Sequence, residues 1–157
     1  MLSYSIRSKR TTPEDALVKR DFHCLYAHEF MRIAAAVPTA GVGDPVANAA
    51  AILGLARQAD EAKAALVVFP ELSLSSYAID DLLHQDALLK AVEQQIGEIA
   101  QASKALYPML IIGAPLRAKG RLYNTAVVIH RGEILGVVSY IRQRFSTSTQ
   151  CASLKKL

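Results

Sequence analysis

Short apolar runs alternate with two longer amphipathic segments in this chain, and this alternation limits the folds open to it. The apolar runs predict buried strands at 31–37, 66–69 and 109–113. The longer segments place apolar residues at helical spacing and predict helices at 45–64 and 85–104. Strands that alternate with helices in this way are typical of α/β folds, in which helices cover at least one face of a sheet.

Signals at the element boundaries support this reading. Asp44 precedes Pro45, a pair typical of a helix start, because the Asp side chain accepts from free backbone N–H groups and Pro needs no acceptor there. Farther along, residues 122–130 and 133–138 flank a turn at Gly132 and predict a β-hairpin. We therefore expect an α/β domain that ends in antiparallel strands.

Composition excludes several classes of protein. The 157 residues are 52% hydrophobic and 20% charged, whereas a disordered chain combines low hydrophobicity with high net charge. No apolar run reaches the roughly 18–20 residues of a membrane helix, and the first 20 residues lack the apolar stretch of a secretory signal. Two cysteines, Cys24 and Cys151, are too few for a disulfide scaffold or a zinc site, so we expect a cytoplasmic protein in a reducing compartment.

The basic charge of the chain lies at its ends. The formal net charge is +4, but residues 1–20 carry five Lys/Arg and two acids, and residues 139–157 carry four Lys/Arg and no acid. The middle, 21–138, holds nine Lys/Arg and twelve acids. A nucleic-acid groove requires basic residues clustered on a folded face with aromatic residues among them. We therefore expect no nucleic-acid partner and no membrane partner.

One acidic residue stands where catalytic groups collect in α/β proteins. Glu71 follows the predicted strand 66–69 in the sequence Phe-Pro-Glu-Leu-Ser-Leu-Ser-Ser-Tyr, and ligands bind beyond the carboxyl ends of such strands. Burial beside Phe69 and Pro70 would raise the pKa of this carboxyl group by desolvation, which would suit it to general-base catalysis. The alternative is a surface glutamate that opens a polar loop.

Other polar residues carry weaker signals. His28 and Glu29 are adjacent, but no third ligand is spaced to join them, so we expect no metal site. Asn124 is expected to be a buried structural amide that satisfies backbone groups near the site. Cys24 precedes the first predicted strand and is expected to pack as a small hydrophobic residue.

The motif Phe69–Tyr77 resembles the first catalytic motif of the carbon–nitrogen hydrolase (nitrilase) superfamily. Further segments fit the same family in the right order: Gly43-Asp44-Pro45, LIIGAP at 110–115 and LYNTAVVIH at 122–130. The likeness extends over about 115 of the 157 residues. Within the superfamily, the chain is most similar to the glutaminase domains of bacterial glutamine-dependent NAD synthetases.

The resemblance implies a fold and a chemistry. The fold would be the N-terminal half of a nitrilase-type four-layer α-β-β-α sandwich, with a basic extension at 1–24, a partial hydrolase domain at 25–138 and a divergent tail at 139–157. In this family a Glu base deprotonates a Cys thiol, a Lys stabilises the oxyanion, and the thiolate attacks a carboxamide. Glu71 matches the base. Glutamine or another small amide would be the substrate, and no cofactor is expected, because ATP belongs to a synthetase domain absent from the chain.

The chain departs from the family pattern after Val138. The family places Pro-Lys directly after the strand that ends in Gly-Val-Val, whereas this chain continues with Ser139, Tyr140, Ile141 and Arg142. Arg142 stands in a different register and does not replace Lys geometrically. Cys151 lacks the context of the family's nucleophile. We therefore expect a truncated or frame-shifted domain that is inactive as this chain.

The alternative hypothesis assigns the chain to a different class. A half-length sandwich would leave one face of its sheet uncovered, and large apolar surfaces favour association. The chain would then be a non-catalytic module that forms a homo-oligomer or associates with a full-length relative.

Overall fold

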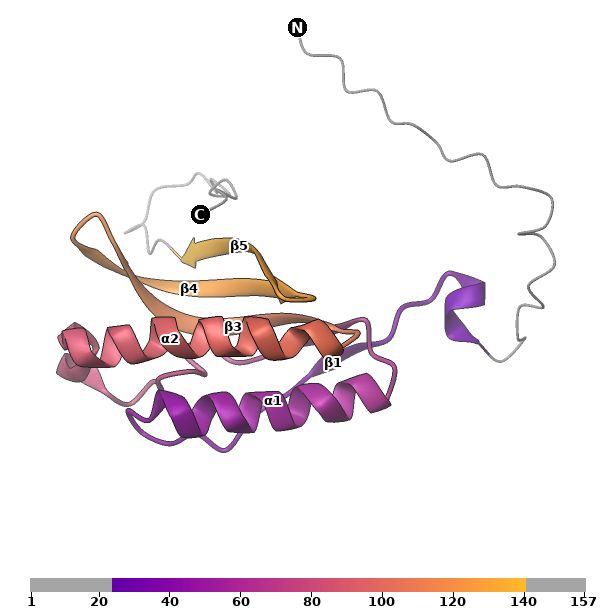
Figure 1. The fold of residues 1–157 in the computed structure, drawn as a ribbon, viewed down its shortest axis with the longest axis horizontal. Helices are drawn as coiled ribbons and strands as arrows, with labels where there is room; N and C mark the ends of the chain where they lie inside the picture. The colour runs from indigo at the N-terminus through magenta and orange to yellow at the C-terminus, as the bar shows by residue number, and fades with distance from the viewer. Residues whose placement is uncertain (1–23, 141–157) are drawn as a thin grey trace, which may run out of the picture. The chain divides into compact units, whose positions relative to one another are not determined.

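The computed structural model describes residues 24–140, which divide into two compact units between Met31 and Arg32 (Figure 1). The described part of the first unit contains one 3-10 turn, η2 (Leu25–His28), preceded by Cys24, which is a free and partly buried thiol. The second unit contains every strand and both α-helices among the described residues. Residues 1–23 of the predicted extension 1–24 and residues 141–157 of the predicted tail 139–157 lie outside the described residues, whereas Ser139 and Tyr140 of that tail belong to a strand.

The second unit is built on one five-stranded sheet in the order β1-β2-β3-β4-β5. The first three strands are parallel, and β3, β4 and β5 are antiparallel neighbours. The strands are β1 (Ile33–Ala35), β2 (Leu66–Val68), β3 (Met109–Ala118), β4 (Arg121–His130) and β5 (Glu133–Tyr140). The predicted α/β class is confirmed, and the sheet changes from parallel to antiparallel pairing at β3.

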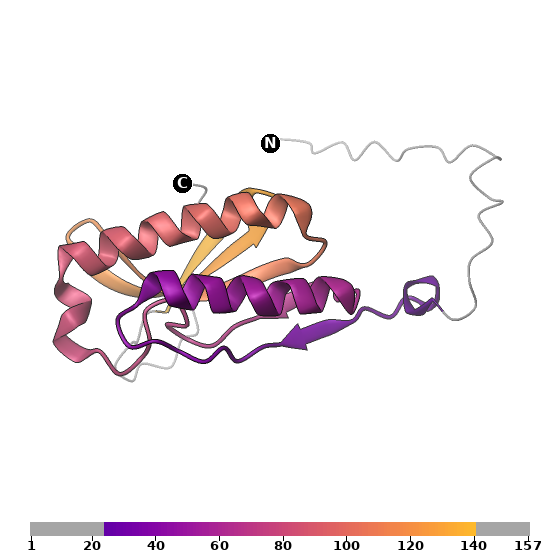
Figure 2. The same cartoon turned by 60° about the horizontal axis from the view of Figure 1, so that its bottom comes forward.

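Two α-helices lie side by side on one face of this sheet, as Figures 1 and 2 both show. Helix α1 (Pro45–Glu61) begins as predicted, since the Asp44 side chain accepts from the Ala47 backbone N–H at 3.0 Å. Helix α2 (Asp86–Ala102) lies between two 3-10 turns, η3 (Asp80–His84) and η4 (Ser103–Ala105). Both helices span slightly less than the predicted ranges because these short turns and loops complete the connections. Within residues 24–140, none of the helices is both long and apolar enough to cross a membrane.

The core lies between the helices and the sheet. Alternate residues of the strands point toward the helices, so Val67, Ile112 and Val127 are fully buried. They pack against apolar residues of α1 and α2 such as Ile52 and Val92, which are also fully buried. The intervening strand residues point to the opposite face, which no helix of the described residues covers (Figure 2).

The strands β3 and β5 are longer than predicted. The sequence pattern indicated a third strand at 109–113, whereas β3 continues to Ala118 and forms a hairpin with β4. The turn uses Lys119 and Gly120, which adopt φ angles of 49° and 72°, as expected for a two-residue hairpin turn. Strand β5 ends at Tyr140, two residues beyond the predicted limit. Antiparallel pairing extends β3 through residues such as Pro115 and Ala118, which have weak strand propensity on their own.

Candidate functional site

Glu71 lies just past the carboxyl end of β2, as predicted, at the start of a tight loop. The loop is fastened to β3 by two backbone hydrogen bonds, from Phe69 N–H to the Ile111 carbonyl at 2.9 Å and from Leu74 N–H to the Gly113 carbonyl at 3.1 Å. Within the loop, Ser73 N–H donates to the Pro70 carbonyl at 3.2 Å. These bonds determine where the Glu71 backbone sits relative to β3.

A glycine in β3 makes this close approach possible. A Cβ atom added to Gly113 would lie 2.3 Å from the Pro70 carbonyl oxygen, 2.5 Å from the Leu72 nitrogen and 2.8 Å from the Glu71 carbonyl carbon. Real Cβ atoms do not approach backbone so closely, so only glycine fits here without displacing the loop. The sequence places Gly113 in a strand but does not reveal that the Glu71 loop lies against it.

A buried amide supports the far end of the same loop. Asn48 of α1 is fully buried, and its Nδ2 donates to the Leu74 carbonyl at 3.2 Å. The same side chain donates to the Gly41 carbonyl at 2.8 Å and accepts from the Gly41 N–H at 2.7 Å. Asn48 therefore connects the loop before α1 to the loop after β2, a role that sequence reasoning missed because its partners are distant in the chain.

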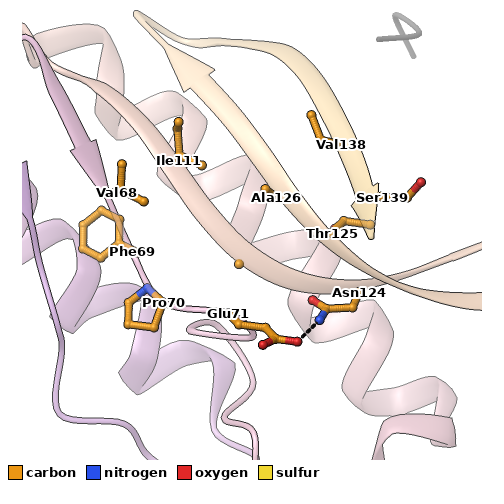
Figure 3. A pocket seen from close by; sticks show the side chains of 11 residues that line it. Val68, Phe69, Pro70, Glu71, Ile111, Asn124, Thr125, Ala126, Val138 and Ser139 are labelled. Carbon is orange, nitrogen blue, oxygen red and sulfur yellow. Dashed lines mark hydrogen bonds between the residues drawn. The ribbon is translucent and has the colours of Figure 1, made fainter. Parts of the chain in front are cut away.

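The Glu71 side chain is exposed, so the burial beside Phe69 and Pro70 that would suit a general base is not found. Phe69 is buried and belongs to the core cluster, whereas the Glu71 carboxylate extends past the end of β2 toward β4 (Figure 3). The alternative reading, a surface glutamate that opens a polar loop, describes its exposure correctly. It does not describe the partner of the carboxylate.

That partner is Asn124 of β4. Its Nδ2 donates to Oε1 of Glu71, and Figure 3 shows the two side chains pointing toward each other. Asn124 is partly exposed, and its amide contacts a carboxylate rather than buried backbone groups. The prediction of a buried structural amide is therefore wrong, while the prediction that Asn124 lies near the site is right.

Glu71 and Asn124 lie at one end of a cavity of about 460 Å³ on the face of the sheet opposite the helices (Figure 3). Its size is in the range of small-molecule sites. One polar residue of β5, Ser139, also lines it. The remaining walls are mostly apolar side chains from β2, β3, β4 and β5, including Val68, Ile111, Ala126 and Val138.

The other predicted candidates lie in other parts of the chain. Arg142 and Cys151 lie outside residues 24–140, so the structure gives no position for either. His28 and Glu29 belong to the first unit. No group of three His, Cys, Asp or Glu side chains that could hold a metal ion is found in the described part of the chain.

Comparison with known proteins shows which family this chain resembles. The carbon-nitrogen hydrolase family model matches residues 32–145, which include Glu71, Gly113 and Asn124. A glutamine-dependent NAD(+) synthetase of Mycobacterium leprae is 54% identical over 117 residues, 74% of this chain and 17% of the relative. The corresponding protein of Aquifex aeolicus is 38% identical over 96 residues, 61% of this chain and 17% of the relative. The chain thus spans about 17% of the length of these relatives.

Solved structures share the fold. A glutamine-dependent NAD(+) synthetase from Cytophaga hutchinsonii matches 74% of this chain and 20% of its own chain, with a TM-score of 0.66 and 24% identity. An amidase from Nesterenkonia sp. matches 74% of this chain and 44% of its own, with a TM-score of 0.60 and 25% identity. The expected nitrilase-type architecture is confirmed over the part that the chain spans. The family match over residues 32–145 confirms the resemblance, and the chain belongs to the carbon-nitrogen hydrolase family.

Proposed function

We propose that this chain carries the base-bearing part of a glutaminase domain of the glutamine-dependent NAD(+) synthetase type. The observation that carries the proposal is the place of Glu71, beyond the end of β2 at the cavity, inside the segment that matches the hydrolase family. In the proposed reaction the Glu71 carboxylate accepts the proton of a cysteine thiol. The thiolate then attacks the carboxamide carbon of glutamine, and the C–N bond breaks as the nitrogen takes the proton from Glu71 and leaves as ammonia. Water then cleaves the thioester, which releases glutamate and restores the thiol.

After Val138 the residues of this chain depart from the family motif. Ser139 and Tyr140 follow Val138, where the family motif has Pro-Lys, and Cys151 has no matching context. Without a nucleophile and an oxyanion donor, the rate of amide hydrolysis falls by a factor of about a million. We therefore propose that the 157-residue polypeptide does not hydrolyse glutamine by itself. No cofactor is proposed for this part, ATP use belongs to a separate synthetase domain, and the proposed location is the cytoplasm.

An ammonia-release assay tests the inactivity of the 157-residue chain. The purified chain is incubated with millimolar glutamine, and ammonia is measured by a coupled enzyme assay beside a Cys151→Ser variant. We expect both proteins to match the buffer. Ammonia release that depends on Cys151 would contradict the proposed inactivity and would identify that thiol as the nucleophile.

The coding DNA beyond codon 138 tests the assignment to the synthetase type. We expect another reading frame to encode Pro-Lys-x-Tyr, a later cysteine motif and a synthetase domain. A protein expressed from the joined frame should release ammonia from glutamine, and Glu71→Gln should lower kcat at least a hundred-fold. The matched control is Glu61→Gln at the end of α1, which should leave kcat unchanged. The proposal would be overturned if no reading frame beyond codon 138 encoded these motifs. It would also be overturned if Glu71→Gln left the kcat of the protein expressed from the joined frame unchanged.

A second candidate function rests on a different observation, the uncovered face of the sheet. Val68 of β2 and Val138 of β5 are 39% and 40% exposed there, beside Ile111 and Ala126. In the four-layer sandwich that the resemblance implies, a second sheet packs on this face. As a non-catalytic module, the chain would bind a full-length relative through the same surface. Co-elution with such a relative would support this role, and a stable monomer in light scattering with no co-elution would exclude it.

A further inference from the structure

We propose that Asn124 is the positioning residue of the catalytic base: it holds one oxygen of the Glu71 carboxylate and leaves the other for proton transfer. The inference rests on the proposed function for the role of Glu71 as base. It goes beyond that function by assigning a task to a neutral side chain on a different strand.

The polarity of the contact determines which amide atom faces the carboxylate. An ionised carboxylate only accepts hydrogen bonds, and the Asn124 amide group donates only through Nδ2. The Nδ2 donates to Oε1 of Glu71 (Figure 3), so the lone pairs of Oε1 toward Asn124 are engaged. The Oε2 atom is outside this bond, and a proton from a thiol can be accepted there.

Both ends of the contact are anchored to the same strand. Asn124 sits within β4, opposite Pro115 of β3 and Tyr140 of β5, so its backbone is paired on both sides. Its neighbour Thr125 adds a buried hydrogen bond from its hydroxyl to the Ala114 carbonyl at 2.7 Å. The loop of Glu71 is likewise held on β3, by the backbone bond from Leu74 to Gly113. The donor and the base are therefore placed relative to each other by β3.

An exposed glutamate needs such a partner if it is to act as a base. Its side chain rotates about three bonds, and an exposed carboxylate samples many positions, whereas general-base catalysis requires hydrogen-bond geometry to the proton that is removed. A misplacement of about 1 Å can lower a rate by about a hundred-fold. A neutral amide such as Asn124 orients the carboxylate through one donated hydrogen bond.

The test measures the order of the Glu71 side chain in the 157-residue protein by NMR relaxation of its Cγ methylene group. In the unmodified chain we expect an order parameter above about 0.6, the level below which groups count as flexible. Asn124→Leu keeps a similar volume but removes the donor, and Asn124→Asp keeps the shape but replaces the donor with a second carboxylate. Both should lower the Glu71 order parameter by at least a third, while Asn124→Gln, which retains a donor, should preserve most of it.

The chain offers a matched control on α2. Gln94 Nε2 donates to Glu98 Oε1 at 2.9 Å, which is another amide–carboxylate pair on an exposed surface. Gln94→Leu should release Glu98 and leave Glu71 ordered, and Asn124→Leu should do the reverse. A Glu71 order parameter that is low in the unmodified chain, or unchanged by Asn124→Leu, would overturn the proposal. Equal losses at Glu71 and Glu98 in Asn124→Leu would also overturn it, since they indicate general loosening.

The result is separable from the proposed function because no substrate is involved. If Asn124 orders Glu71 but the joined protein shows no dependence on Glu71, the proposed function fails while the contact stands. If Glu71 is needed for activity but is not ordered by Asn124, the positioning role fails alone.

Discussion

Replacing Gly113 with alanine tests most directly how this chain places Glu71. The new Cβ would lie 2.3 Å from the Pro70 carbonyl oxygen, while ordinary van der Waals contact begins near 3.4 Å. The loop must therefore retreat from β3 by about 1 Å, because the obstructing atoms belong to backbone and cannot rotate aside. Overpacking of this kind costs about 1–3 kcal/mol of the free energy of unfolding.

The effect is measured in two ways. Urea unfolding followed by circular dichroism should show the lower free energy of unfolding, and the midpoint of thermal unfolding should fall by about 4–15 °C for a domain of this size. Hydrogen exchange should show faster exchange of the Phe69 and Leu74 amides, which donate to Ile111 and Gly113 across the gap that has to open.

The same substitution elsewhere is the control. A Cβ added to Gly54 in α1 meets nothing within 4 Å, so Gly54→Ala should raise the free energy of unfolding by about 0.5–1 kcal/mol through helix propensity. Opposite signs for the two glycines are the expected outcome. A Gly113→Ala protein as stable as the unmodified chain, with unchanged exchange of Phe69 and Leu74, would refute the reasoning.

Three further substitutions test the support of the site. Asn48→Ala should lower the free energy of unfolding, measured by urea unfolding, by about 2–3 kcal/mol, because Gly41 and Leu74 lose their buried partner. If the exposed Gln94→Ala lowered the free energy of unfolding by the same amount, this reasoning would be contradicted. Asp44→Ala should cost about 1 kcal/mol by calorimetry, since α1 loses its N-cap bond, and Asp44→Asn should restore most of it. Ile112→Ala should cost about 2–5 kcal/mol in the same measurement because Ile112 is fully buried, and a cost below 1 kcal/mol would argue against the core described above.

Local patterns were sufficient to predict most elements of the fold. Helix α1 begins at Pro45 because its cap and its first residue are adjacent in the sequence, and β2 ends before Pro70 for an equally local reason. The extension of β3 to Ala118 was not predicted. Its last residues form a strand because β4 pairs with them, and such pairing is a property of the folded sheet rather than of the segment.

The surroundings of the site could not be predicted from local patterns. The sequence left open whether Glu71 is buried beside its apolar neighbours or exposed, because side-chain burial depends on what packs over the residue in space. In the structure its carboxylate extends past the end of β2 and meets Asn124, 53 residues later in the chain. The importance of Gly113 for the Glu71 loop was equally hidden, since it depends on a close backbone approach between β3 and the loop after β2.

The sequence by itself therefore determined the class of fold, the family and the residue that matches the base, because these depend on short-range periodicity and on motifs contiguous in the chain. Only the tertiary structure decided that Glu71 is exposed, that Asn124 donates to it and that Gly113 lets its loop lie against β3. The physical reason is that hydrogen bonds and close contacts act over a few ångströms. Strand pairing brings together groups that lie tens of residues apart in the chain.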